Sequence, residues 1–201
     1  MRGQWPHGLL RYHKLGAARC SLERVLRLAT KVTVTGSALV LLYFLWRSLA
    51  WPLIHDAAIM HYIAWLISQG AVPYRDAFDM NMPGVYLIHL AVLVLGGAGD
   101  AAWRTFELGW LGATAGLMYL YGRPLGDRWS AAAPALLFAI HHLAGGASSA
   151  GQRDFLICLF LLAGAYGVAR SCESRGRLAP LLGAGLILRS EEHTSELQSQ
   201  R

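Results

Sequence analysis

The feature that most constrains this chain is a nearly unbroken apolar segment, Val32 to Ile54, which directly follows a basic stretch. About 20 apolar residues, each rising about 1.5 Å along a helix, cross the hydrocarbon core of a bilayer. The segment therefore predicts a membrane-spanning helix, with Arg47 close enough to the far end to extend its charge to the interface. A chain built around such a helix is an integral membrane protein.

The composition extends this conclusion to the rest of the chain. Of the 201 residues, 55% are hydrophobic and 15% are charged, whereas soluble domains carry about 25% charged residues. The net charge of +6 comes from basic residues interleaved with apolar runs, which argues against nucleic-acid binding. The three cysteines, Cys20, Cys158 and Cys172, show no CxxC spacing and predict neither a disulfide framework nor a zinc site.

The segments before and after this first span have different predicted locations. Residues 1–31 carry seven Lys or Arg against one acid and are interpreted as a cytoplasmic arm, because short cytoplasmic segments are rich in Lys and Arg. Residues 55–104 are expected to form the first outer loop. Within it, Asp56 to Gln69 predicts an interfacial amphipathic helix that Gly70 ends. Its apolar positions are Ile59, Tyr62, Ile63, Leu66 and Ile67.

The remaining apolar segments complete the predicted topology. Pro83 to Leu95 is too short to cross and is expected to be interfacial. Further spans are expected at about Thr105 to Tyr121, Trp129 to Leu143, Phe155 to Ala169, and from Leu178 onward. The predicted fold class is all-α: a polytopic transmembrane helix bundle with about five spans over residues 32–188 and interfacial helices in the first outer loop. This arrangement places 12 Lys or Arg inside and three outside, in agreement with the positive-inside rule.

The last residues break the pattern of the chain. A polar block, Arg189 to Ser199, interrupts an apolar segment that runs from Leu178 to Leu188. The block resembles the conceptual translation of a widely used short-read sequencing adapter. We therefore interpret residues 189–201 as an artefactual tail and expect the natural protein to continue past Leu188. A polar cytoplasmic tail is the alternative.

Two acids lie at predicted outer helix ends. Asp56 directly follows the first span, and Arg153-Asp154 opens a later one. A carboxylate at the bilayer edge is poorly solvated, so it usually pairs, coordinates a metal or handles protons. Two carboxylates and one cation at the same face suit deprotonation of a hydroxyl and binding of a leaving phosphate. The alternative is that both acids cap their helices and that Arg153 contacts lipid headgroups.

Three motifs carry a resemblance to a known family. They are Asp56 after the first span, the loop pattern Gly70-x-x-Pro73-Tyr74-x-Asp76-x-Phe78-Asp79 followed by Pro83-Gly84, and Gly151-Gln152-Arg153-Asp154. With these motifs, the chain from Thr30 to Leu188 resembles the membrane-embedded GT-C glycosyltransferases. The branch in question contains protein O-mannosyltransferases and the lipid A aminoarabinose transferase.

This resemblance implies a function and a set of site residues. The implied reaction transfers a sugar, with inversion, from a polyprenyl-phosphate donor to an acceptor at the outer membrane face. Asp56 matches the family's first-loop acid, which has a base or acceptor-orienting role, and Asp154 matches its second-loop acid; both are predicted to be catalytic. Asp79 falls where relatives carry an acid linked to a divalent metal. Predicted substrate-binding residues are Tyr74, Arg75, Asn81, Arg104, Gln152 and Arg153.

Two departures from the family bear on these expectations. Relatives often have Lys-Pro-Pro where this chain has Asn81-Met82-Pro83, so Arg75, Arg104 or Arg153 would have to supply the cation near the donor phosphate. The helices that follow the fifth span in relatives are missing, so we expect this fragment to be inactive as written.

The expected location and partners follow from the resemblance. The implied location is a bacterial inner membrane, with the N-terminus in the cytoplasm and the active face in the periplasm. The expected partners are a lipid-linked sugar donor, membrane lipid, and a glycan, lipid or protein acceptor. A transporter and a small structural membrane protein are the alternatives. A transporter would place charges or broken helices near the bilayer midplane, whereas the acids here collect at one face.

Overall fold

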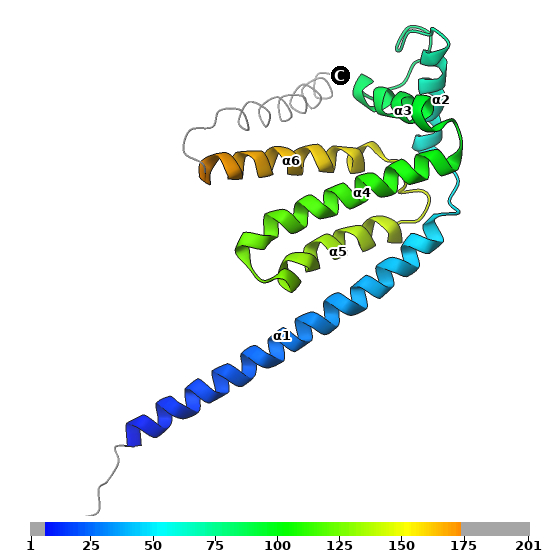
Figure 1. Ribbon diagram of the computed structural model, residues 1–201. Helices are drawn as coiled ribbons and strands as arrows, with labels where there is room; N and C mark the ends of the chain where they lie inside the picture. The colour runs from blue at the N-terminus through cyan, green and yellow to red at the C-terminus, as the bar shows by residue number, and fades with distance from the viewer. Residues whose placement is uncertain (1–6, 174–201) are drawn as a thin grey trace, which may run out of the picture.

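The computed structural model describes residues 7–173, and its regular structure is helical (Figure 1). Within this range the only β-type pairing is an isolated bridge between Pro73 and Ala77. The predicted span from Leu178 and the predicted tail 189–201 lie outside the described residues. The elements are α1 (His7–Ser48), α2 (His55–Ser68), α3 (Pro83–Gly96), α4 (Asp100–Gly122), the 3-10 turn η1 (Arg123–Leu125), α5 (Arg128–Ala144) and α6 (Arg153–Glu173).

Helix α1 is longer than the predicted span and ends earlier. It runs for 42 residues without a break at the boundary between residues 31 and 32, because Leu, Arg, Ala and Glu are all good helix formers. The helix ends at Ser48 rather than Ile54, since Pro52 lacks a backbone N–H and disfavours helical backbone in the residue before it. Figure 1 shows its N-terminal half projecting beyond the other helices.

Two described helices are long and apolar enough to cross a membrane by themselves. They are Ser21–Ser48, within α1, and Arg153–Ser171, within α6. The pair formed by Pro83–Gly96 and Asp100–Leu125 counts as a third only if both parts form one span, because the two are bent by 119°. Helix α5 has 17 residues, fewer than the 20 or so of a typical span. The protein is therefore a membrane protein, with two or three candidate spans within residues 7–173.

Helices form at both segments that were predicted to be interfacial, and the face of α2 that is buried in the protein shares only Ile63 with its predicted apolar positions. Helix α2 ends near Gly70, whose φ is +95°. Ile59 and Tyr62, two of the predicted apolar positions, are exposed by 54% and 58%. The buried residues are Ala57, Met60, His61, Ile63 and Ala64. Small side chains on this stripe allow neighbouring backbones to approach closely, which an apolarity count does not register.

Helices α4, α5 and α6 lie side by side, and α1 packs along α5 (Figure 1). Asp127 is the N-cap residue of α5, and its carboxylate accepts a hydrogen bond of 2.8 Å from the Ser130 N–H. Its buried positions recur every four residues, at Ala131, Ala135, Ala139 and Leu143. Alanines at this spacing form a smooth face against which other helices pack closely in membranes.

The main apolar core lies where α2 and α3 cover the start of α4, the end of α5 and the start of α6, which we call the α2–α3 end. Helices α2 and α3 contact each other, and α3 contacts α4. The most buried core residues are Met60, Tyr86, Trp103, Leu111, Leu143 and Leu156. Loops that are distant in sequence are thereby held together at one end of the bundle.

Gly151 is the tightest contact between these loops. Its φ is +73°, a conformation that glycine adopts without strain. A Cβ placed there would lie 2.6 Å from the Ala57 Cβ and 2.9 Å from Trp103 Nε1. The loop before α6 is therefore pressed against the first turn of α2 and against α4.

We predict that Gly151→Ala destabilises the protein more than Gly146→Ala does. Gly146 is the matched control because its φ is +74° and nothing lies within 4 Å of a built Cβ. Both variants incur the backbone penalty of about 1–2 kcal/mol, and Gly151→Ala adds about 1–3 kcal/mol for overpacking. The measurement is the unfolding free energy in mixed detergent micelles, and equal losses for the two variants would contradict the contact.

Candidate functional site

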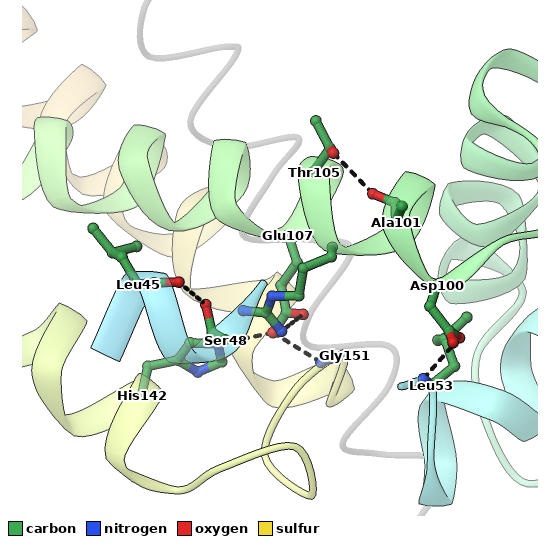
Figure 2. A network of polar contacts seen from close by, with 10 residues as sticks. Leu45, Ser48, Leu53, Asp100, Ala101, Thr105, Glu107, His142 and Gly151 are labelled. Atoms are coloured by element: carbon green, nitrogen blue, oxygen red, sulfur yellow. Dashed lines mark hydrogen bonds and ion pairs between the residues drawn. The ribbon is translucent and has the colours of Figure 1, made fainter. Parts of the chain in front are cut away.

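A buried carboxylate, Glu107, organises the α2–α3 end (Figure 2). Its side chain is 0% exposed. It accepts hydrogen bonds from Arg104 Nη1 at 2.6 Å, from His142 Nε2 at 2.9 Å and from the Gly151 backbone N–H at 3.0 Å. These donors belong to α4, α5 and the loop before α6. One carboxylate thus joins three segments of the chain.

Arg104, a predicted substrate-binding residue, lies inside this network rather than at an open surface. Its side chain is 3% exposed, and its Cζ lies 4.9 Å from the centre of the Trp51 ring, a cation–π geometry. Its Nε and Nη2 atoms are buried without a hydrogen-bond partner among the described residues. The charge of Arg104 therefore faces Glu107 and Trp51.

Four of the predicted site residues come together where the loop before α3 meets the start of α6. Arg153 Nη1 donates to Asn81 Oδ1 at 3.0 Å, across 72 residues of sequence. The Asn81 amide donates to Asp79 Oδ2 at 2.8 Å, and the Tyr74 hydroxyl donates to the Asn81 carbonyl at 2.6 Å. Tyr74, Asp79, Asn81 and Arg153 therefore form one hydrogen-bonded group, which we call the loop cluster.

The carboxylate of Asp79 is held ionised in this cluster. Partial burial acts to raise its pKa, but hydrogen bonds from Asn81, Tyr86 and the Met80 N–H, together with the charge of Arg153, lower the pKa below its usual value. Three of the acceptor positions of the carboxylate are occupied by these donors. A metal ion at Asp79 would compete with them for the same oxygens.

The metal role of Asp79 therefore stays a prediction, and a bound metal ion would have to displace hydrogen-bond donors from its carboxylate. Among residues 7–173, the structure places no group of three or more His, Cys, Asp or Glu side chains where they could hold a metal ion. Oxygen-rich coordination of a divalent cation needs further carboxylates, carbonyls or waters besides one Asp.

Arg75, another predicted substrate-binding residue, is paired within its own turn. Its Nε and Nη2 atoms donate to the two oxygens of Asp76, both at 2.8 Å, and the Val72 N–H also donates to Asp76. The pKa of Asp76 is lowered, first by the hydrogen bond from Arg75 and then by that from Val72. This bidentate pair stabilises the turn that carries Tyr74.

The two predicted catalytic acids are exposed. Asp56 lies in the first turn of α2, but the N-cap residue of that helix is Ile54, and no side-chain cap bond is present. Asp154 is 82% exposed, and its carboxylate lies 3.5 Å from Arg153 Nε. Gln152, the neighbouring predicted substrate-binding residue, donates its amide to the Ser148 carbonyl at 3.2 Å. Asp56 therefore does not cap α2, and its carboxylate is accessible.

The loops that carry these two acids are in contact. Ala57 follows Asp56, and Gly151 precedes Asp154 by three residues; the close approach of Ala57 and Gly151 fixes the two loops against each other. The hydrogen bond between Arg153 and Asn81 adds the loop cluster to the same group. All of the predicted site residues therefore lie at the α2–α3 end, although only some of them touch.

A hollow of about 420 Å³ opens beside this group, lined by His142, Ser149, Gln152 and Phe155 among others. The His142 ring stacks on Phe155, with ring centres 3.8 Å apart. Ligand pockets have volumes of about 300–1,000 Å³. The hollow is thus large enough for a small polar ligand.

Sequence reasoning did not find the network around Glu107. The sequence signal for this network is that Glu107, an acid in an apolar segment, follows Arg104 by three residues. This spacing places both side chains on one helix face. Nothing in the sequence indicates His142 or the Gly151 N–H as further partners, because they lie 35 and 44 residues away.

Comparisons with protein-family models, with curated proteins and with solved structures find no match to this chain.

We predict that Glu107→Ala lowers the unfolding free energy by about 3–5 kcal/mol, because the substitution leaves Arg104 as an uncompensated buried charge. The matched control is Glu23→Ala, which removes an exposed ion pair with Arg27 at 3.6 Å and should cost less than about 1 kcal/mol. Unfolding in mixed micelles measures both. Similar losses for the two variants would show that Glu107 does not hold the helices together.

The lowered pKa of Asp79 predicts a pH-dependent stability contribution. Because the folded pKa lies below the unfolded one, the contribution is present at neutral pH and is lost as the pH falls through the folded pKa. Asp79→Asn should therefore lower the melting temperature in non-ionic detergent at about pH 7, and the gap to wild type should narrow toward about pH 3. A gap that does not change with pH would contradict this assignment.

Proposed function

We propose that this chain is the N-terminal part of an integral-membrane glycosyltransferase. The reaction transfers a sugar from a polyprenyl-phosphate donor to an acceptor hydroxyl at the outer face of the membrane, with inversion at the anomeric carbon. The observation that carries the proposal is the hydrogen bond between Arg153 and Asn81. It supports one interfacial site built from the first outer loop and the start of α6, the two segments that carry the family motifs.

The roles follow from the accessible side chains. The carboxylates of Asp56 and Asp154 are exposed and accept hydrogen bonds from hydroxyl groups of the acceptor and of the donor sugar. The guanidinium of Arg153 is 43% exposed and pairs with the leaving phosphate, a geometry that suits a planar fork of N–H groups. Arg153 is favoured as the replacement for the family's lysine because its ion pair with Asp154 is long, at 3.5 Å. Arg75 binds both oxygens of Asp76 at 2.8 Å, and Arg104 is 3% exposed and bonded to Glu107.

The orientation is part of the same proposal. The basic stretch at the start of α1 lies in the cytoplasm, as the excess of Lys and Arg indicates. The α2–α3 end then faces the periplasm, where the lipid-linked donor would present its sugar. The bacterial inner membrane is the proposed location.

The test begins with the gene. Resequencing source DNA across the codons for Leu186 to Arg201 should reveal further apolar spans in place of the adapter-like block. The complete product is then reconstituted in nanodiscs with polyprenyl-phosphate mannose and polyprenyl-phosphate aminoarabinose, and release of polyprenyl phosphate is measured. A stop codon at the present end, or no consumption of either donor, would overturn the proposal.

We predict that Asp56→Asn and Asp154→Asn each lower the transfer rate by about 100-fold or more with normal membrane insertion, since hydrogen bonds to ionised carboxylates orient the reacting groups. The matched control is Asp127→Asn. Asp127 caps the N-terminal end of α5, which is the end remote from the α2–α3 end (Figure 1). Asn caps a helix about as well as Asp. Wild-type rates for Asp56→Asn or Asp154→Asn would remove that acid from the site.

A further inference from the structure

The hydrogen-bonding partners of Glu107 determine which nitrogen of His142 is available for chemistry. The charge of the carboxylate is balanced by Arg104, which is bonded to Oε2. Oε1 faces His142 Nε2 at 2.9 Å and accepts from the Gly151 N–H. Since a carboxylate only accepts hydrogen bonds, Nε2 carries the proton, and the lone pair of the neutral ring lies on Nδ1.

This Nδ1 belongs to a ring that borders the hollow. The His142 side chain is 8% exposed, and its ring is fixed on one side by Phe155. Among the described residues, the hydrogen-bonding partner of His142 is Glu107, which contacts Nε2. The ring also lines the hollow together with the polar groups of Ser149 and Gln152. A carboxylate behind the ring and a cavity beside it form the arrangement in which histidine acts as a general base.

We propose that His142 receives the proton of an acceptor hydroxyl bound in the hollow and that Glu107 is the residue that positions it. This inference rests on the proposed function. The hydroxyl O–H bond breaks and its proton moves to Nδ1 of His142. The oxygen electron pair forms a bond to the anomeric carbon of the donor sugar. The bond from that carbon to the phosphate oxygen breaks, and polyprenyl phosphate leaves with the electron pair.

The location of the hollow matches this role. Gln152 lines it and directly precedes Arg153, which the proposed function assigns to the leaving phosphate. The acceptor hydroxyl and the donor phosphate would therefore bind on neighbouring residues at the start of α6. The substrate class that fits is a polyhydroxylated acceptor, because the polar lining offers a hydroxyl, an amide and an imidazole.

The first experiment uses diethyl pyrocarbonate on the 201-residue chain in nanodiscs, with modified histidines mapped by mass spectrometry. We expect His142 to be modified, more slowly than the exposed His141, because its ring borders the hollow while its side chain is 8% exposed. His89, which is 0% exposed, should stay unmodified. Protection of His142 to the same degree as His89 would overturn this inference and leave the proposed function standing.

The second experiment measures transfer by the complete product. His142→Gln should lower kcat by about 100-fold with an unchanged KM for the lipid donor, and imidazole should restore part of the activity of His142→Ala. Glu107→Gln still accepts from Nε2 but loses the charge that balances the protonated ring, so its kcat should also fall at constant KM. The matched control is His61→Gln, a buried histidine whose Nδ1 lies 3.4 Å from His89 Nδ1.

The outcomes separate the two proposals. Wild-type kcat in His142→Gln, or loss of activity in His142→Ala that imidazole does not relieve, would overturn the role of His142 while transfer by the wild type upholds the proposed function. An inactive wild type would overturn both. A fall in kcat in the His142 and Glu107 variants but not in His61→Gln, with rescue of His142→Ala by imidazole, would establish the assignment.

Discussion

The α2–α3 end depends on one interaction, the burial of the Glu107 carboxylate among three donors. Removing a carboxylate from water costs several kcal/mol, and the cost is met only where hydrogen bonds and an opposite charge are already in place. Arg104, His142 and the Gly151 N–H fulfil this requirement from three segments. Each segment must therefore hold its partner in position, and the start of α4, the end of α5 and the loop before α6 are fixed together.

Much of the secondary structure could be predicted because its signals are local. The expected starts of α3 at Pro83 and of α6 near Phe155 agree with the observed ones within two residues, since proline fits the first position of a helix and apolar runs mark the rest. The length of α1 could not be predicted, and the apolar spacing of α2 does not say which of its faces packs against the other helices. The length and the packing face depend on helix propensity outside the apolar run and on close packing at Ala57 and Ala64, neither of which raises local apolarity.

The site shows the same division between local and distant information. The sequence identified Asn81 and Arg153 as polar residues in outer segments, and their direct hydrogen bond is consistent with a shared face. It also placed Arg104 among the outer-loop cations that could bind the donor phosphate. A span boundary drawn from hydropathy does not reveal that Arg104 is buried against Glu107 on the same helix. The partner of a charged residue is a property of the tertiary structure, and it decides whether that residue remains available to a ligand.

Arg104 and Arg153 differ in burial, and this difference separates their roles at the α2–α3 end. In an apolar bundle each cation either is neutralised inside or stays at the edge, and the structure assigns Arg104 to the first group and Arg153 to the second. Glu107 of the buried pair holds His142 through Nε2, while the exposed Arg153 directly follows Gln152 in the sequence. Because Gly151 touches Ala57 and also donates to Glu107, a shift in the buried network would move the loops that carry both Asp56 and Asp154. Stability and site geometry are thus coupled through a single glycine.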